Sequence, residues 1–174
     1  MRKILSTVAI SAVLSTGAIA GDLYGSMGAA VTSPTGGWDS GISVVVTGGM
    51  KLDSVFPGFA AEVEVSQTVV DPSYSWSGYG ASGDIDLSVL GVGAYAVYNF
   101  QIPGNALVIK PRLGFNYQSW SIDGNGWSGA EADDTSLSFG IGATYPISNG
   151  LIVYADFTDK GDSNNIGAGV GMSF

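Results

Sequence analysis

The chain of 174 residues is long enough for one domain, and it contains neither cysteine nor histidine. Those absences exclude disulfide frameworks, thiol nucleophiles, zinc sites built on cysteine or histidine, and every mechanism with imidazole as the general base. The formal charge of −9 argues against a nucleic-acid partner, because phosphate binding needs clustered lysine and arginine. With 45% hydrophobic residues, the chain is also too apolar to be disordered.

Residues 1–20 have the features of a secretory signal peptide. Arg2 and Lys3 form a basic start, an apolar run covers residues 4–14, and Ala18 and Ala20 frame a small-residue cleavage site. A membrane anchor is the weaker interpretation, because the run is shorter than the roughly 20 apolar residues that a spanning helix needs. We therefore predict export, with a mature domain over residues 21–174.

The mature part predicts eight β-strands. Apolar residues alternate with small or polar ones at 22–32, 41–52, 59–68, 84–100, 106–120, 135–145, 151–157 and 166–174. The connections 33–40, 69–83, 121–134 and 158–165 are long, whereas 53–58, 101–105 and 146–150 are short and carry turn signals such as Pro57-Gly58. This alternation predicts an up-and-down antiparallel arrangement with the long connections at one end.

The faces of these strands fit lipid surroundings better than water. A water-facing surface normally carries about a quarter charged residues or more, and these strands carry few. A strand that crosses a bilayer has about 9–11 residues, and the sheet must close so that every backbone group is paired. We predict an all-β fold, an eight-stranded antiparallel up-and-down transmembrane β-barrel. A soluble barrel is the alternative.

Charged residues of both signs occur in the middle of the predicted strands, opposite the apolar faces. Ionisable groups inside a narrow barrel are expected to pair with one another. We therefore predict an ionic network in the lumen, made of Glu62, Glu64, Asp86, Lys110, Arg112 and Asp156. Inward glycines such as Gly167 and Gly169 should make room for tyrosines pointing inward, namely Tyr24, Tyr98 and Tyr154.

Two positions depart from this pattern. The face of Asp86 continues as Leu90 and Val92, which requires either a β-bulge or an apolar stretch of lumen. Pro111 lies inside a strand of a closed sheet and cannot donate a ladder hydrogen bond, so the neighbouring strand should already have ended there.

The chain resembles the small eight-stranded outer-membrane β-barrels of Gram-negative bacteria, the group of the OmpA transmembrane domain, OmpX and Ail. The likeness rests on the end of the signal peptide, residues 110–115, residues 140–145 before a short turn, and the terminal Phe174. It implies a location in the outer membrane next to lipopolysaccharide, and a plug of mixed charges in the barrel. It also implies that Phe174 is part of the signal read by the barrel assembly machinery.

The long connections are the leading candidates for function. The aromatic residues that could contact an extracellular ligand are Trp38, Tyr74, Trp76, Tyr79 and Trp127. The leading hypothesis is a structural and surface-interaction barrel. The alternative is a small porin-like channel whose lumen charges set its selectivity.

A third hypothesis is a hydrolase that uses Glu62 and Glu64, which share one face. Outer-membrane barrel enzymes, as families, use histidine, and this chain has none. We therefore predict no enzymatic activity and no cofactor. The acidic connection 121–134 could hold a divalent cation, but it lacks the EF-hand spacing, so we predict no metal site.

Overall fold

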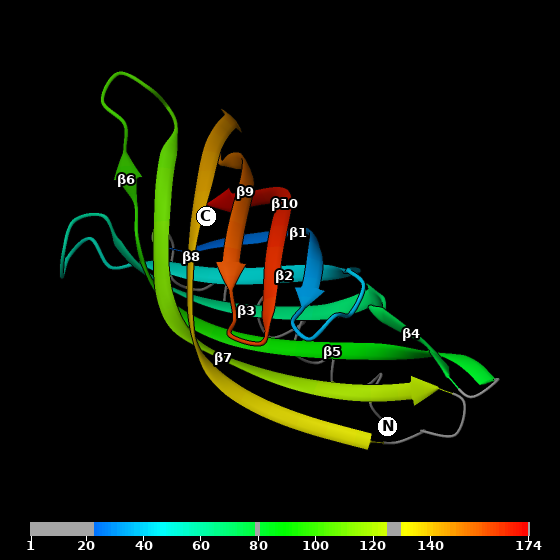
Figure 1. Cartoon of the computed structure of the whole chain (residues 1–174). Coiled ribbons are helices and arrows are strands. Elements are labelled where there is room, and N and C mark those ends of the chain that lie inside the picture. Colours follow the sequence, from blue (N-terminus) through cyan, green and yellow to red (C-terminus); the bar gives the residue numbers. More distant parts are fainter. Residues whose placement is uncertain (1–22, 79–80, 125–129, 174) are drawn as a thin grey trace.

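The computed structural model describes residues 23–78, 81–124 and 130–173, and its regular elements there are all β-strands (Figure 1). No helix in these ranges is long and apolar enough to cross a membrane, a finding that does not bear on crossing by strands. The strands are β1 (Leu23–Pro34), β2 (Gly41–Lys51), β3 (Phe59–Val70), β4 (Ser73–Gly78), β5 (Ala81–Tyr98), β6 (Phe100–Gln101), β7 (Val108–Gly124), β8 (Ala130–Ser148), β9 (Leu151–Asp159) and β10 (Ser163–Ser173).

The strands form one closed antiparallel sheet. Around the ring, β1 pairs with β2, β2 with β3, β3 with β5, β5 with β7, β7 with β8, β8 with β9 and β9 with β10, and β1 pairs with β10 in the register Ala29↔Ala168 to close the ring. The short strand β4 continues the chain from β3 along β5, and β6 continues the chain from β5 along β7. The ring of the barrel therefore contains eight strands, which confirms the predicted eight-stranded barrel.

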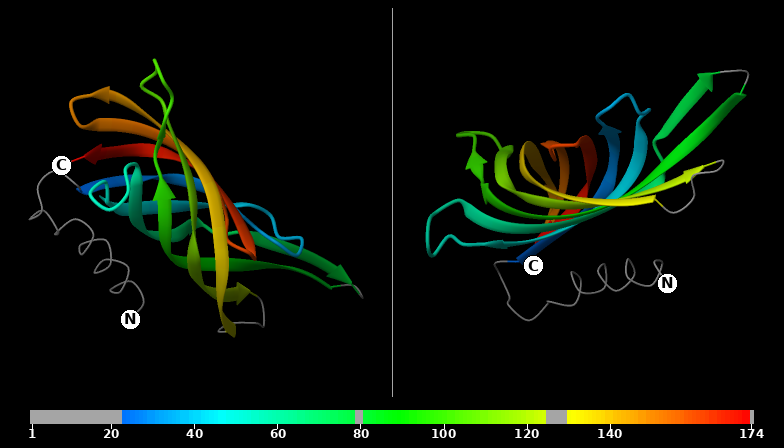
Figure 2. Two further views of the ribbon diagram at one scale, coloured as in Figure 1. Left: turned by 90° about the vertical axis from the view of Figure 1, so that its left-hand side faces the viewer. Right: turned by 60° about the horizontal axis from the view of Figure 1, so that its bottom comes forward.

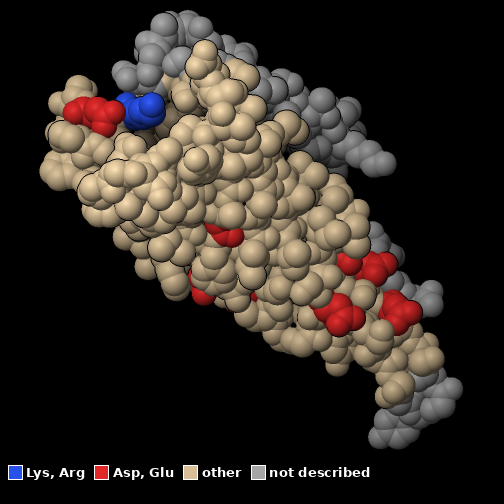
Figure 3. All heavy atoms as spheres, turned by 90° about the horizontal axis from the view of Figure 1, so that it is seen from above, with Lys and Arg blue, Asp and Glu red and all other residues tan. Residues whose placement is uncertain are grey.

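Side chains alternate between the lumen and the outer wall. On β3, Glu62 and Glu64 are buried inside, whereas Val63 between them is exposed on the outside. The middle of the molecule accordingly presents a largely uncharged surface (Figure 3). This outer surface is an apolar belt suited to lipid, and its large exposed side chains include Met27, Val31, Val63, Leu113, Phe115, Leu137, Phe139, Ile141, Ile166 and Val170.

Two of the predicted long connections are largely β-structure. Residues 73–78 and 81–86 pair as the β4–β5 hairpin, β7 continues to Gly124, and β8 already begins at Ala130. The four strands β4, β5, β7 and β8 extend past the ends of β1, β2, β9 and β10 (Figures 1 and 2). We refer to this part, residues 73–78 and 81–86 of β4–β5 together with 119–124 and 130–138 of β7–β8, as the projecting sheet.

The register of β5 corrects the prediction for Asp86. Glu62 pairs with Tyr95, which is buried in the lumen, and side chains change sides at every residue. Asp86 lies an odd number of positions before Tyr95 and is exposed, so its assignment to the lumen network was wrong. The same register places Leu87 and Val89 inside and leaves Tyr98 on the outer wall, so the prediction of an inward Tyr98 was also wrong.

Pro111 lies where the ladder between neighbouring strands is interrupted. The pair Val97↔Arg112 is the last between β5 and β7, and the next pair along the same edge is Phe100↔Ile109 of β6. Asn99, opposite this gap, donates its backbone N–H to the carbonyl of Gly58 instead. The position therefore tolerates a residue without an N–H, as the sequence required.

Candidate functional site: the lumen plug and the projecting sheet

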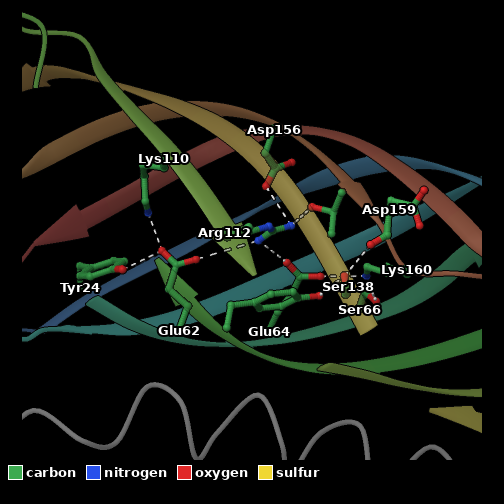
Figure 4. Close-up of polar contacts among 12 residues, drawn as sticks. Tyr24, Glu62, Glu64, Ser66, Lys110, Arg112, Ser138, Asp156, Asp159 and Lys160 are labelled. Carbon is green, nitrogen blue, oxygen red and sulfur yellow. Dashed lines mark hydrogen bonds and ion pairs between the residues drawn. The ribbon is translucent and has the colours of Figure 1, made fainter. Parts of the chain in front are cut away.

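Five of the six predicted charges meet inside the barrel. Glu62 and Glu64 come from β3, Lys110 and Arg112 from β7, and Asp156 from β9, three strands that are not neighbours in the sheet (Figure 4). Each side chain reaches the lumen because it lies on the inward face of its strand. The structure thus brings together all the predicted members except Asp86.

Arg112 is the centre of this network. Its Nη1 lies 2.8 Å from Oε2 of Glu64 and 4.0 Å from Oε2 of Glu62, and its Nη2 lies 3.5 Å from Oδ2 of Asp156. Nη2 also donates to the hydroxyl of Thr158. The guanidinium carbon is 4.6 Å from the ring centroid of Tyr95, a cation–π distance. One buried cation therefore holds three carboxylates from two strands.

Lys160 is a member of the network that the sequence analysis missed. It follows β9 in the turn before β10, yet only 1% of its side chain is exposed. Its Nζ lies 2.8 Å from Oε1 of Glu64 and donates to Oγ of Ser66 at 3.2 Å. The signal was present, because Tyr154, Asp156 and Thr158 alternate inward and Lys160 continues the same face. The ammonium group thus closes the network from the long-connection end.

Lys110 completes the network toward the short-turn end. Its Nζ is 2.5 Å from Oε1 of Glu62, and the hydroxyl of Tyr24 donates to the same oxygen at 2.7 Å. The ammonium nitrogen also lies 4.8 Å from the ring centroid of Tyr24. The three cations Lys110, Arg112 and Lys160 thus balance the three carboxylates of Glu62, Glu64 and Asp156. We call these six residues the lumen plug.

Glycines on the inner wall make room for the tyrosine rings around the plug. A Cβ on Gly49 would lie 2.2 Å from Cζ of Tyr24, and a Cβ on Gly28 would lie 2.5 Å from the hydroxyl of Tyr154. A small cavity of about 40 Å³ lies beside the rings on the short-turn side of Arg112. That volume holds a few waters at most.

Trp38, Tyr74 and Trp76, three of the five predicted aromatic contacts, lie on or beside the projecting sheet. Trp38 packs against Tyr74 with ring centroids 5.7 Å apart. The ring of Trp76 covers Gly83 across the β4–β5 hairpin, since a Cβ there would lie 3.1 Å from its Nε1. Tyr74 and Trp76 are exposed. Tyr79, Trp127, Phe174 and the signal peptide lie outside the described residues, so those assignments stay predictions.

Glu62 and Glu64, the two candidates for a hydrolase, are each bound by cations of the lumen plug, and Glu62 also lines the small cavity beside the rings. Among the described residues, no group of three or more acidic side chains is placed to hold a metal ion. The tip of the connection 121–134 lies outside that range.

A closed eight-stranded sheet with an apolar outer belt and an ionic lumen defines a small transmembrane β-barrel. The profile of the outer membrane protein beta-barrel domain family matches residues 5–174. The chain therefore belongs to this family, as its resemblance suggested, and the family implies a location in the outer membrane. No curated protein sequence shows a significant match to the chain.

Solved structures share the fold at low sequence identity. Neisserial surface protein A is 18% identical with a TM-score of 0.61, over 87% of this chain and 96% of that one. A major outer membrane protein from Thermus thermophilus is 12% identical with a TM-score of 0.62, over 88% and 100%. Ail, the attachment invasion locus protein of Yersinia pestis, is 16% identical with a TM-score of 0.56, over 88% and 100%.

Proposed function

We propose that this protein is a plugged barrel whose task is to present the projecting sheet as a binding surface outside the membrane. The observation that carries the proposal is the pair of free edges on that sheet. Among the described residues, the backbone of β4 from Tyr74 to Gly78 pairs only with β5, and the backbone of β8 from Ala132 to Thr135 pairs only with β7. Such edges present unpaired backbone groups to which another extended chain can add.

The charge of the projecting sheet indicates the chemistry of the partner. Residues 69–86 and 119–138 contain no lysine or arginine, and Asp84, Asp86 and Asp133 are exposed there. Several acidic side chains gather toward the lower-right end of the molecule in Figure 3, whereas at the upper-left end acidic side chains lie beside a basic one. Together with the exposed rings of Tyr74 and Trp76, this surface suits an extended, lysine- or arginine-rich protein segment, because opposite charge steers encounter and aromatic rings supply contact area.

Peptide binding to proteoliposomes tests the proposal. We expect a synthetic peptide of alternating lysine and valine to bind the barrel, and the same peptide with every backbone nitrogen methylated to bind more weakly, because methylation then removes the ladder donors on both edges of the peptide strand and keeps the charge. Equal binding of the two peptides would contradict strand addition. We also expect Tyr74→Ser with Trp76→Ser to weaken binding several-fold, whereas Gln101→Ala at the opposite end should leave it unchanged.

The lumen plug argues against the channel alternative. The buried side chains of Arg112, Glu64 and Lys160 cross the lumen in direct contact, and the nearby cavity holds only a few waters. We expect planar-bilayer recordings of the folded protein to show no discrete conductance steps. Regular steps whose selectivity changes in Lys110→Ala would instead support a channel lined by the plug.

A further inference from the structure

The turn between β2 and β3, residues 52–58, carries large apolar side chains at its tip. Val55 is 78% exposed and Phe56 is 57% exposed. The other longer turn at the same end, residues 102–107 between β6 and β7, has no exposed large apolar side chain, and its tip is Pro103, Gly104 and Asn105. Of these two turns, only 52–58 therefore has an apolar tip, while at the third turn of this end the exposed Ile147 lies on the last residues of β8.

The 52–58 turn packs against the outer wall of the barrel. The ring centroid of Phe56 lies 6.2 Å from that of Tyr98, and a Cβ on Gly58 would lie 3.0 Å from the Tyr98 ring. Tyr98 faces outward, and the exposed Phe100 follows it on β6. Val55 and Phe56 thus continue the apolar belt beyond the ends of the strands.

The backbone of the turn meets the requirement for entering an apolar medium, where unpaired N–H groups are costly. Val55 and Phe56 both donate to the carbonyl of Leu52, and Phe59 donates to the carbonyl of Phe56. Gly58 donates to Oδ1 of Asp53 at 2.7 Å, and Pro57 has no N–H. Every backbone N–H from residue 55 to residue 59 is therefore satisfied inside the turn.

We propose that residues 52–58 are a lipid anchor that inserts Val55 and Phe56 into the leaflet around the short-turn end. In barrels of this class the short turns face the periplasm, so the leaflet is the periplasmic one. The anchor goes further than a girdle of aromatic rings on strands, because here the tip of a turn that packs against the outer wall enters lipid. It is independent of the surface-binding function, which lies at the other end.

Depth-dependent fluorescence quenching tests this anchor. Phe56→Trp is placed in the full-length protein, folded in vesicles of phosphatidylcholine brominated on the acyl chains, and Asn105→Trp is the matched control on the neighbouring turn. The four natural tryptophans give a common background that is subtracted. We expect blue-shifted emission at position 56 that brominated lipid quenches and acrylamide does not. Position 105 should show the reverse.

Each other outcome overturns the anchor. Quenching of position 56 by acrylamide at the level of position 105 means that the turn is in water. Protection from both quenchers that disappears when the vesicles contain more lipid per protein means that a second copy covers the turn. A gel-shift assay for the folded barrel, made on the same samples, ensures that both variants are compared in the folded state.

Discussion

Arg112→Met is expected to lower the free energy of unfolding of the barrel by about 3–5 kcal/mol, the usual cost of removing one partner from a buried ion pair. Methionine fills much of the volume of arginine but leaves Glu64 with Lys160 alone and Asp156 without its nearest cation. Glu64 is buried and only 19% of the Asp156 side chain is exposed, so water can repay little of the loss. Urea titration in phospholipid vesicles, followed by the gel mobility of folded and unfolded protein, measures the change.

Two companion variants sharpen the result for Arg112. Lys51→Met removes a cation at the end of β2, outside the lumen plug, and should change the stability by less than about 1 kcal/mol. Combining Arg112→Met with Asp156→Asn should recover part of the loss, because the carboxylate that lost its nearest cation is then neutral. A stability of Arg112→Met equal to that of the parent would mean that the plug does not stabilise the barrel.

Gly28→Ala is the second substitution with a large expected effect. The new Cβ would lie 2.2 Å from the carbonyl oxygen of Ala168, 2.5 Å from the hydroxyl of Tyr154 and 2.8 Å from Cα of Gly169. Two of these three atoms are backbone and cannot move aside without disturbing the β1–β10 ladder. We expect a loss of about 3 kcal/mol, at the upper end of what overpacking costs.

The matched control for Gly28 is Gly142→Ala, also on the inner wall. There the nearest atom to a new Cβ would be Cβ of Asp156 at 3.4 Å, an ordinary van der Waals contact. The same urea titration should therefore find Gly142→Ala within about 0.5 kcal/mol of the parent. If the two alanine variants were equally stable, steric crowding at the β1–β10 seam would not limit the sequence there.

The number of strands, the polarity of their faces and most of the lumen plug could be predicted from the sequence. These features depend on side chains that alternate between the two faces of a strand, a pattern that is visible in the sequence itself. On β3 the alternation of Glu62 and Glu64 with Val63 admits only one choice of faces. The same rule failed on β5, where both faces contain apolar residues. Leu87 and Val89 point inward and Leu90 and Val92 point outward, so only the pairing with β3 decides which side Asp86 takes.

Features that depend on how far pairing continues were not predictable from local patterns. The polar and glycine-rich composition of residues 69–83 is typical of a loop, yet the segment pairs as a hairpin, with the Oγ of Ser75 donating to Asp84 at 2.8 Å. Lys160 was assigned to the connection 158–165 because that segment too has a polar and glycine-containing composition. Its burial depends on Glu64, which lies far earlier in the chain and reaches it only once the barrel is closed.

The seam between β1 and β10 constrains the order in which the protein assembles. It joins the first and last strands of the chain, with pairs such as Val31↔Ile166, so it is the ladder with the largest separation in sequence. Contacts of this kind form late, because the entropy of closing a long loop must be overcome first. Until that step both edges of the sheet are unpaired, and the acid and base groups of β3, β7 and β9 lie apart on an open surface. We therefore expect the pairing of β1 with β10 and the formation of the ion pairs in the lumen plug to occur together, as the last step of folding.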